Sequence, residues 1–315
     1  MMAKIFIDGS EGTTGLRIFE RFQNRTDIEL LKIPTEQRKD ADVRKKFINE
    51  SDITFLCLPD AAAIEAVSLV ENPNVRIIDA STAHRTLPDW SYGFPELSPG
   101  HREAIATGKR IAVPGCYASG FMAIVYPLVK LGIASADYMF ACNAVSGYSG
   151  AGKKAIAQYE DAGREKAFDA PRLYAMGQMH KHLKEMQAIP GLKAMPNFQP
   201  FVCDYYCGMI VNIPLQVSLL KKKVTAENVK ELLSEYYKDT KMVKVMPFVQ
   251  TGTDDGFLPA NKLAGFDFME IYVAGNDERI SISACFDNLG KGASGAAVQC
   301  MNIMLGCEET FGLSV

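Results

Sequence analysis

The sequence predicts an α/β protein with two domains: a Rossmann-type, doubly wound parallel sheet and an α+β catalytic domain with a mixed or antiparallel sheet. The chain has 315 residues, more than the ~100–150 that commonly share one core. Apolar strands and helices alternate through its first third, a rhythm typical of a parallel sheet. We expect residues 1–116 with the C-terminal segment 289–315 to form the first domain, and residues 117–288 the second.

The first domain begins with a short apolar strand, Lys4–Asp8, followed by a glycine-rich loop. A helix comes next, with Leu16, Phe19 and Phe22 expected on one buried face. Further strands are expected at Ile28–Ile33, Asp52–Leu58, Val75–Asp79 and Arg110–Val113, and a crossover helix at Ala61–Val70. Asp52–Leu58 is almost entirely apolar, which indicates a strand covered on both faces.

The pattern changes after Cys116 to longer strands joined by hairpins. Glu270–Ala274 and Arg279–Phe286 predict a hairpin across Gly275-Asn276-Asp277, and the second arm alternates apolar and small polar residues. The other expected elements are strands Tyr138–Val145, Met209–Val217 and Lys241–Phe248, and helices Ala151–Ala162, Ala226–Lys238 and Ala293–Leu305. Hairpins of this kind favour a mixed or antiparallel sheet.

Composition narrows the range of partners. The 34 Lys and Arg residues against 37 Asp and Glu give a formal charge of −3, which gives no support for nucleic-acid binding. No apolar run approaches the ~20 residues that a membrane-spanning helix needs. Residues 3–7 lead straight into Asp8 and the glycine loop, so no secretory signal peptide is predicted.

Eight cysteines in a chain of this length do not predict a dense disulfide framework. Cys203 and Cys207 form a Cys-x₃-Cys pair, but neither a second pair nor a nearby histidine completes a zinc site. We therefore expect no metal, and a protein of the reducing cytoplasm.

The glycine loop predicts a dinucleotide site. Gly9, Ser10, Gly12, Thr13, Thr14 and Gly15 lie between a first strand and a first helix, where backbone N–H groups and the helix dipole can hold a pyrophosphate. The alternative is a tight turn that glycine merely permits. After the second strand, Thr35, Arg38 and Lys39 suit a 2′-phosphate and favour NADP(H), whereas Glu36 keeps NAD open.

Cys116 is the candidate nucleophile. Pro114 and Gly115 force a turn after a strand, so that Cys116 starts an apolar helix. The helix dipole and nearby N–H groups favour the thiolate of a cysteine there, and the same donors can stabilise an oxyanion. A buried, packed cysteine is the competing interpretation.

A thiolate nucleophile generally works with a base or proton donor. Two of the four histidines, His180 and His182, lie close together before Glu185. If the segment were helical, residues two apart would point to opposite faces, so one ring alone could meet Cys116. The alternative is a pair of surface histidines in a basic stretch.

Together with the glycine loop and Pro-Gly-Cys-Tyr at 114–117, further segments resemble those of the N-acetyl-γ-glutamyl-phosphate reductase family in its shorter form. Val113 stands where the family usually has Asn, Lys153 where it has Arg, and Lys184 where its His-x-His-x-Pro-Glu segment has Pro. The similar segments are Ile78–Arg85, Tyr92–Leu97, Val113–Tyr117, Ser146–Lys153, His180–Glu185 and Asp287–Gly295.

The resemblance implies an NADPH-dependent reductase of an acyl phosphate that works as a homo-oligomer, dimeric or tetrameric. It implies that Cys116 forms a thioester and that His180 or His182 is the acid–base. The residues it implies for substrate or phosphate binding are Arg85, Ser146, Lys153 and Glu96. Ser81 and Asn288 join the glycine loop as implied cofactor contacts.

Two other functions remain open at this stage. An aspartate-semialdehyde dehydrogenase-type reductase shares the architecture and the thioester chemistry, but it resembles residues 92–97 and 180–182 less. A non-catalytic NADP-sensing protein with a vestigial site is the alternative from another class.

Overall fold

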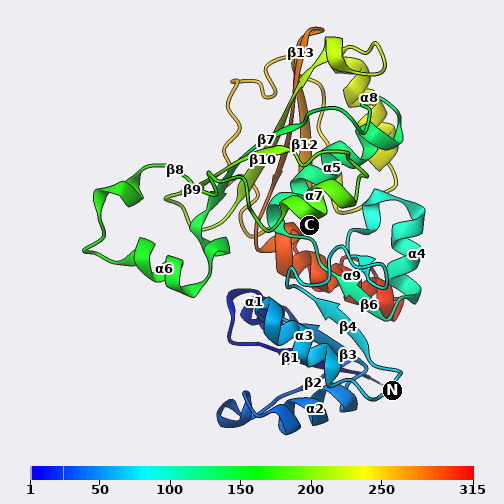
Figure 1. Ribbon diagram of the computed structural model, residues 1–315, viewed down its shortest axis with the longest axis vertical. Coiled ribbons are helices and arrows are strands. Elements are labelled where there is room, and N and C mark those ends of the chain that lie inside the picture. Colours follow the sequence, from blue (N-terminus) through cyan, green and yellow to red (C-terminus); the bar gives the residue numbers. More distant parts are fainter. Residues whose placement is uncertain (1, 24) are drawn as a thin grey trace. The chain divides into compact units, whose positions relative to one another are not determined.

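The computed structural model describes residues 2–23 and 25–315 (Figure 1). The chain forms two compact units. The first comprises the described residues up to 115 together with 293–313, and the second comprises residues 116–292 together with 314–315.

The first unit is built on a six-stranded sheet of order β2-β1-β3-β4-β6-β5, in which every neighbouring pair is parallel. This confirms the doubly wound parallel sheet. Its strands are β1 (Ala3–Asp8), β2 (Ile28–Leu31), β3 (Ile53–Leu56), β4 (Arg76–Asp79), β5 (Ser91–Tyr92) and β6 (Arg110–Ala112). Its helices are α1 (Thr13–Phe22), α2 (Ala41–Glu50), α3 (Asp60–Ser68), α4 (Pro99–Thr107) and α9 (Gly295–Leu305).

The side chains of alternate residues of β1 pack into two separate hydrophobic cores, one on each face of this sheet. Ile5 and Ile7 pack with residues of α1 and α9, while Phe6 packs on the opposite face with residues of α2 and α3. Because side chains alternate along a strand, a strand covered on both faces must be apolar throughout. All four residues of β3 are accordingly buried.

The predicted buried face of α1 was wrong in one residue. Ile18 and Phe22, four apart, are buried, whereas Leu16 is 45% exposed. A spacing of three drifts around a helix of 3.6 residues per turn, so Leu16 and Phe22 do not share one face.

The second unit holds a seven-stranded sheet of order β11-β12-β13-β10-β7-β9-β8. The β7–β9 and β11–β12 pairs are parallel and the other pairs antiparallel, which confirms the predicted mixed sheet. Its strands are β7 (Ala141–Gly147), β8 (Arg172–Leu173), β9 (Asn197–Cys203), β10 (Met209–Gln216), β11 (Val243–Val245), β12 (Met269–Gly275) and β13 (Arg279–Phe286). Its helices are α5 (Cys116–Lys130), α6 (Lys153–Glu160), α7 (Leu183–Ala188) and α8 (Ala226–Tyr237).

Helix α5 lies directly on the sheet of the second unit. A Cβ atom on Gly120 would stand 2.6 Å from the Val211 side chain and 2.9 Å from that of Phe286, so glycine allows the close approach of α5 to β10 and β13. The Tyr237 hydroxyl donates to the Ala123 carbonyl over 2.9 Å and thereby ties α8 to α5. This packing fixes the helix that begins with Cys116.

Several expected boundaries after Cys116 were wrong. The helix predicted over Ala151–Ala162 is interrupted at Gly152 (φ +84°), so a 3₁₀ turn precedes α6. The strand predicted over Lys241–Phe248 shrinks to Val243–Val245, the three residues that pair with β12. The last helix begins with a π-helical turn at Gly290–Ser294. Strand β9 was not predicted. In Figure 1, the segment that connects β7 to β8 and contains α6 extends away from the sheet.

Candidate active site

Cys116 lies at the first turn of α5 and lines a cavity of about 560 Å³. It is half-buried, so the sulfur combines contact with the cavity and the positive end of a helix. A Cβ atom on Gly292 would stand 3.0 Å from the Cys116 Cβ, so this glycine packs against the cysteine. The cavity lining is drawn from α5, the end of β7 and the turn after it, β8, β9 and the chain between β8 and α7: Cys116, Tyr117, Ser146, Gly147, Gly150, Ala151, Arg172, Leu173, Tyr174, His180, Lys181 and Val202.

The structure separates the two candidate histidines. Helix α7 begins only at Leu183, so both precede it. His180 is half-buried and lines the Cys116 cavity, whereas His182 is 5% exposed and is not among the lining residues. The rings lie 4.6 Å apart. The geometry therefore brings His180, rather than His182, together with Cys116.

A backbone contact selects the tautomer of His180. The N–H of His182 donates to His180 Nδ1 over 3.1 Å. A ring nitrogen that accepts a hydrogen bond carries no proton, so the neutral imidazole holds its proton on Nε2. His180 can thus offer a proton from Nε2 while Nδ1 stays engaged by the backbone.

Two tyrosines close the cavity beside this ring. The Tyr174 hydroxyl donates to the Tyr117 hydroxyl over 3.0 Å, and His180 lies edge-on to both rings, with centroids 5.8 Å from each. Burial raises the pKa of both phenols. Both are therefore neutral hydroxyls that can hydrogen-bond a substrate without adding negative charge.

Arg172 is a lining residue that the sequence analysis missed. Its guanidinium lies over the ring of Phe168 at 3.8 Å and that of Tyr159 at 4.9 Å, and its Nε donates to the Tyr159 hydroxyl over 3.2 Å. An arginine supported on aromatic rings keeps its fork of donors for an anion. Lys181 adds a second cation, and the lining residues that the structure describes include no Asp or Glu. No local motif marks Arg172.

The loop after β7 forms one wall of this cavity and is held by a hydrogen bond with Asn288. Asn288 Nδ2 donates to Ser149 Oγ over 2.9 Å, and Asn288 Oδ1 accepts from the Gly208 N–H at 2.9 Å. Ser149 and Asn288 are both almost fully buried. Asn288, expected to contact the cofactor, thus supports the wall that Gly147 and Gly150 present. Lys153, expected to bind substrate, is exposed at the start of α6 and outside the lining.

The glycine loop in the first unit borders a second cavity, of about 360 Å³. Gly9 has φ +88°, and a Cβ atom there would stand 2.4 Å from the Cys57 carbonyl oxygen. A Cβ atom on Gly15 would stand 2.3 Å from the Gly9 carbonyl oxygen. Both positions therefore require glycine. Helix α1 begins at Thr13, next to Thr14, without a side-chain cap, which leaves its first N–H groups for a ligand.

The lining of this second cavity fits an adenosine with a phosphate on its ribose. Ile33, Leu58 and Ala62 offer apolar surface for a base, and Arg38 and Lys39 offer positive charge. Arg38 lies 3.5 Å from Glu11, an exposed pair that a phosphate can replace. Ser10 also lines the cavity, whereas Thr35 is exposed and is not among the lining residues.

A network of ion pairs around the buried Arg44 supports the same cavity and was not predicted. Arg44 Nε donates to Asp8 Oδ2 over 3.0 Å, and Nη1 donates to Glu65 Oε2 over 2.9 Å. These residues belong to α2, β1 and α3 respectively. Burial raises the pKa of Asp8, and hydrogen bonds from Arg44 oppose that shift. These ion pairs hold α2, β1 and α3 together around the cavity.

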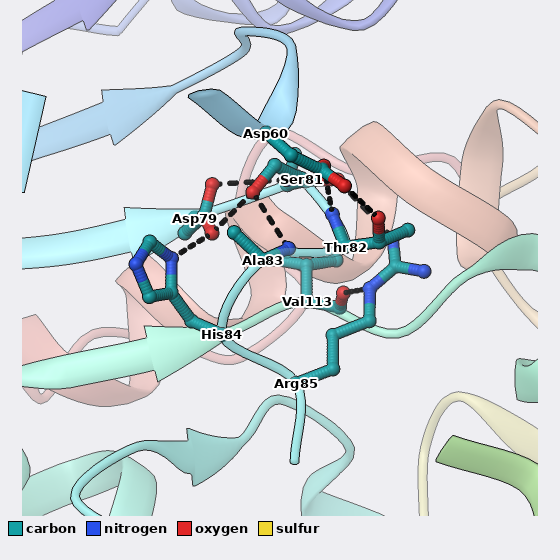
Figure 2. Close-up of polar contacts among 9 residues, drawn as sticks. Asp60, Asp79, Ser81, Thr82, Ala83, His84, Arg85 and Val113 are labelled. Atoms are coloured by element: carbon teal, nitrogen blue, oxygen red, sulfur yellow. Dashed lines mark hydrogen bonds and ion pairs between the residues drawn. The ribbon is translucent and has the colours of Figure 1, made fainter. Parts of the chain in front are cut away.

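Ser81 and Arg85, two further predicted contacts, belong to a tightly bonded loop after β4 (Figure 2). Ser81 Oγ and His84 Nδ1 both lie 2.6 Å from Asp79 Oδ2. Arg85 Nε donates to the Val113 carbonyl over 2.8 Å, and Nη2 donates to the Ala80 carbonyl over 3.1 Å. The contacts drawn in Figure 2 hold this loop in one conformation.

Glu96, expected near the substrate, is buried in the first unit. Gln299 Nε2 donates to Glu96 Oε1 over 2.7 Å and to Glu309 Oε1 over 2.6 Å. Through Gln299, Glu96 joins the turn before α4 to α9. Glu96 is not among the lining residues of either cavity. Among the described residues, no group of three or more His, Cys, Asp or Glu could hold a metal ion.

Two family models together match most of the chain. Residues 4–107 match the family model described as semialdehyde dehydrogenase, NAD binding domain, and residues 116–288 match semialdehyde dehydrogenase, dimerisation domain. The chain is 46% identical to "N-acetyl-gamma-glutamyl-phosphate reductase 2" of Nostoc sp., over 98% of this chain and 99% of the relative. It is also 46% identical to the enzyme of the same name from Pseudomonas putida, over 98% of both chains.

Solved structures support the fold. Aspartate semialdehyde dehydrogenase II from Vibrio cholerae, complexed with ASA, gives a TM-score of 0.70 at 16% identity, covering 97% of this chain and 99% of that one. The aspartate semialdehyde dehydrogenase from Francisella tularensis gives 0.70 at 16% identity, covering 96% of this chain and 100% of that one. With both family models and full-length relatives in agreement, the chain belongs to the semialdehyde dehydrogenase family and, within it, to the N-acetyl-γ-glutamyl-phosphate reductases.

Proposed function

We propose that the chain reduces N-acetyl-γ-glutamyl phosphate with NADPH to N-acetylglutamate semialdehyde and phosphate, a reaction of arginine biosynthesis. The observation that carries this proposal is the meeting of Cys116 and His180 in one cavity of a chain whose full-length relatives bear the name of that reductase.

Cys116 begins the chemistry as a thiolate. Its sulfur attacks the acyl carbon, the bond from that carbon to the phosphate oxygen breaks, and phosphate leaves with its electron pair, so that a thioester remains on Cys116. We assign stabilisation of the oxyanion to the N–H groups at the start of α5. NADPH, when bound, supplies the hydride that reduces the thioester carbon.

His180 handles the proton in the second half of the reaction. The reduced carbon carries an alkoxide, which takes a proton from His180 Nε2 to give a thiohemiacetal. On collapse the hydroxyl returns a proton to Nε2, the carbon–sulfur bond breaks, and the Cys116 thiolate is regenerated with the aldehyde. His182 does not line the cavity, and it holds His180 through its backbone N–H.

The charges in the Cys116 cavity favour a substrate with an acylated amine. Arg172 and Lys181 suit its carboxylate and phosphate groups. The lining that the structure describes offers no carboxylate to a free ammonium, and burying an unpaired ammonium is costly. N-acetylation removes that positive charge, so an N-acetylated acyl phosphate fits better than aspartyl phosphate does.

Arg38, Lys39 and the start of α1 are the residues that would hold NADPH. The charges of these two cations suit the 2′-phosphate, and the N–H groups around Gly12 and Thr13 suit the pyrophosphate. Ser81 and Arg85 fix the loop after β4. Ser81 stays a predicted contact of the cofactor and Arg85 a predicted contact of the substrate.

We also infer that the chain works in the cytoplasm as a homodimer or homotetramer. The matched dimerisation domain supports self-association. The eight cysteines form no disulfide within the described ranges, as is usual in a reducing compartment. No helix in the described part of the chain is long and apolar enough to cross a membrane. Light scattering on the purified protein measures the oligomer directly.

The test of the activity is the reverse reaction. The purified protein is incubated with NADP⁺, phosphate and either N-acetylglutamate semialdehyde or aspartate semialdehyde, and NADPH is followed by absorbance. We expect oxidation that depends on phosphate and a far larger kcat/KM for the acetylated aldehyde. A preference for aspartate semialdehyde would assign the chain to the other reductase type, and NADP⁺ binding without turnover would favour a sensing protein.

A further inference from the structure

The segment that carries His180 into the cavity has an unusual backbone. Ala175 (φ 52°) and Gln178 (φ 54°) are the two non-glycine residues in the left-handed region among those that the structure describes. They lie between Tyr174 and His180, both of which line the Cys116 cavity. A left-handed conformation is costly for residues with a Cβ atom, so other contacts must hold this turn in place.

The turn begins where an edge strand leaves the sheet. Strand β8 lies at the edge and pairs antiparallel with β9, with Leu173 opposite Phe201. The N–H of Tyr174 still donates to the Pro200 carbonyl over 3.1 Å. The backbone then turns away, and the Gln178 N–H donates to the Ala175 carbonyl over 3.0 Å.

The side chain of Gln178 continues the ladder that the backbone has left. Its Nε2 donates to the Phe198 carbonyl over 2.7 Å, and its Oε1 accepts from the Phe198 N–H at 2.8 Å. Phe198 precedes Pro200 by two residues in β9. Its backbone N–H and C=O are the next pair of groups on β9 that face the edge strand. The side-chain amide thus satisfies both groups that a further residue of β8 would have satisfied.

The same strand residue also supports the catalytic ring. The Phe198 ring lies 5.2 Å from that of His180 and 5.2 Å from that of Tyr117, measured between centroids. Phe198 therefore holds the turn through its backbone and packs against His180 through its side chain. Both contacts act on one short segment, residues 175–180.

We propose that Gln178 is a positioning residue for His180. By pairing its amide with the backbone of Phe198, it holds the strained turn so that the His180 ring faces the Cys116 cavity. The inference rests on the acid–base role assigned to His180 above. Gln178 itself is outside the cavity lining.

The test compares three variants that break the pairing in different ways. Gln178→Ala removes the amide, and Gln178→Glu keeps the length but cannot donate to the Phe198 carbonyl. Gln178→Gly relieves the left-handed backbone while it removes the amide. Gln187→Ala is the matched control, because Gln187 Nε2 donates to the Lys193 carbonyl over 3.1 Å and neither residue lines the cavity.

We expect kcat to fall about 10- to 100-fold in all three Gln178 variants, the loss typical of a slightly misplaced catalytic group. KM for N-acetylglutamate semialdehyde should change by less than about 3-fold, because the groups that bind substrate are untouched. The limb of the pH–kcat profile that His180→Gln abolishes should move in Gln178→Ala. Gln187→Ala should match the wild type.

A second readout needs neither cofactor nor turnover. Nitrogen-15 NMR of the imidazoles reports their tautomers, and the chain's four histidines can be assigned by substitution. We expect His180 to be protonated on Nε2 in the wild type and to lose that preference in Gln178→Ala.

The outcomes separate the two proposals. An inactive His180→Gln together with Gln178 variants of normal kcat and an unchanged tautomer would overturn the positioning role while leaving the acid–base role intact. Full activity in Gln178→Gly alone would show that strain, rather than pairing, is what matters, and would also overturn it. Full activity in His180→Gln would instead overturn the proposed role of His180.

Discussion

Arg44 and Arg172 each line a cavity, but the protein treats their charges in opposite ways. Arg44 is 6% exposed and is bonded to two carboxylates, Asp8 and Glu65. Arg172 is half-buried, lies on two aromatic rings and donates to the Tyr159 hydroxyl. The first guanidinium is occupied within the fold, whereas the second keeps donors for a ligand.

This difference shows why residue type alone does not identify a binding site. A buried arginine between carboxylates stabilises the elements around it, because removing either partner leaves an uncompensated charge. An arginine on aromatic rings gains support without being neutralised. The comparison predicts that the two cavities can be damaged separately, one through stability and the other through catalysis.

The largest effect should come from Cys116→Ala. Without the nucleophile no thioester forms, so turnover should fall by a factor on the order of 10⁴ or more. NADPH binding, measured by fluorescence, should stay unchanged, because the glycine loop belongs to the other unit. A loss of only a few-fold would remove Cys116 from the mechanism.

Thiol labelling provides the control for this prediction. Burial raises the pKa of the Cys57 and Cys142 thiols, and raises that of Cys285 to about 12. Since the thiolate is the reactive form, iodoacetamide near neutral pH should modify Cys116 before these three. Peptide mass spectrometry over a time course gives the order, and faster labelling of a buried thiol would contradict the assignment.

Arg44→Met should have the next largest effect, on stability. It leaves the Asp8 carboxylate buried without its partner, at a cost of about 3–5 kcal/mol. Trp90, the chain's single tryptophan, packs against the core cluster that includes Ile48 of α2, so its fluorescence follows urea unfolding of this unit.

The double variant Asp8→Asn, Arg44→Met is the control for this ion pair. It should recover much of the loss, because no charge remains buried alone between β1 and α2. Equal destabilisation by the single and double variants would mean that packing, rather than charge, holds this wall of the cavity.

Arg172→Ala should act on catalysis instead. Loss of one charge-assisted contact of about 1.5–3 kcal/mol lowers kcat/KM for N-acetylglutamate semialdehyde about 10- to 100-fold. Arg172→Lys should recover little, because an ammonium does not reproduce the planar fork. Arg279→Ala, which removes an exposed arginine paired with Glu278, should leave kcat/KM unchanged.

The contrast between the two arginines also explains what sequence could predict. The glycine loop is local in sequence, because strand, turn and helix follow one another. The steric demand at Gly15 comes from Gly9 in the same loop, although that at Gly9 comes from Cys57, which follows β3. Cys116 at a helix start is local as well. Both patterns were therefore readable, as was the alternation that predicted the parallel sheet.

The rest of the Cys116 cavity depends on distant parts of the chain. Arg172 takes its meaning from Tyr159 and Phe168, and the choice of His180 over His182 depends on where α7 begins. Asn288 and Glu96 lie in segments that resemble those of the reductase family. Their side chains nevertheless form hydrogen bonds with Ser149 and Gln299, respectively. A motif identifies a residue type, whereas burial and partners decide whether that residue meets a ligand.

The smallest expected effect is on cofactor choice, through Arg38→Ala. The Arg38 side chain is 43% exposed and its Glu11 partner 62% exposed, so solvent weakens whatever contact it makes with a 2′-phosphate. We expect wild-type protein to prefer NADPH to NADH, and Arg38→Ala to narrow that preference by about 1 kcal/mol, roughly 5-fold. The loss should fall on NADPH alone and shrink at high salt. Lys46→Ala, which removes an exposed lysine of α2 near Glu50, should not change the ratio of kcat/KM values. If Arg38→Ala weakens the binding of both cofactors equally, Arg38 supports the shape of the cavity as Arg44 does. The contact with the 2′-phosphate would then be assigned to Lys39.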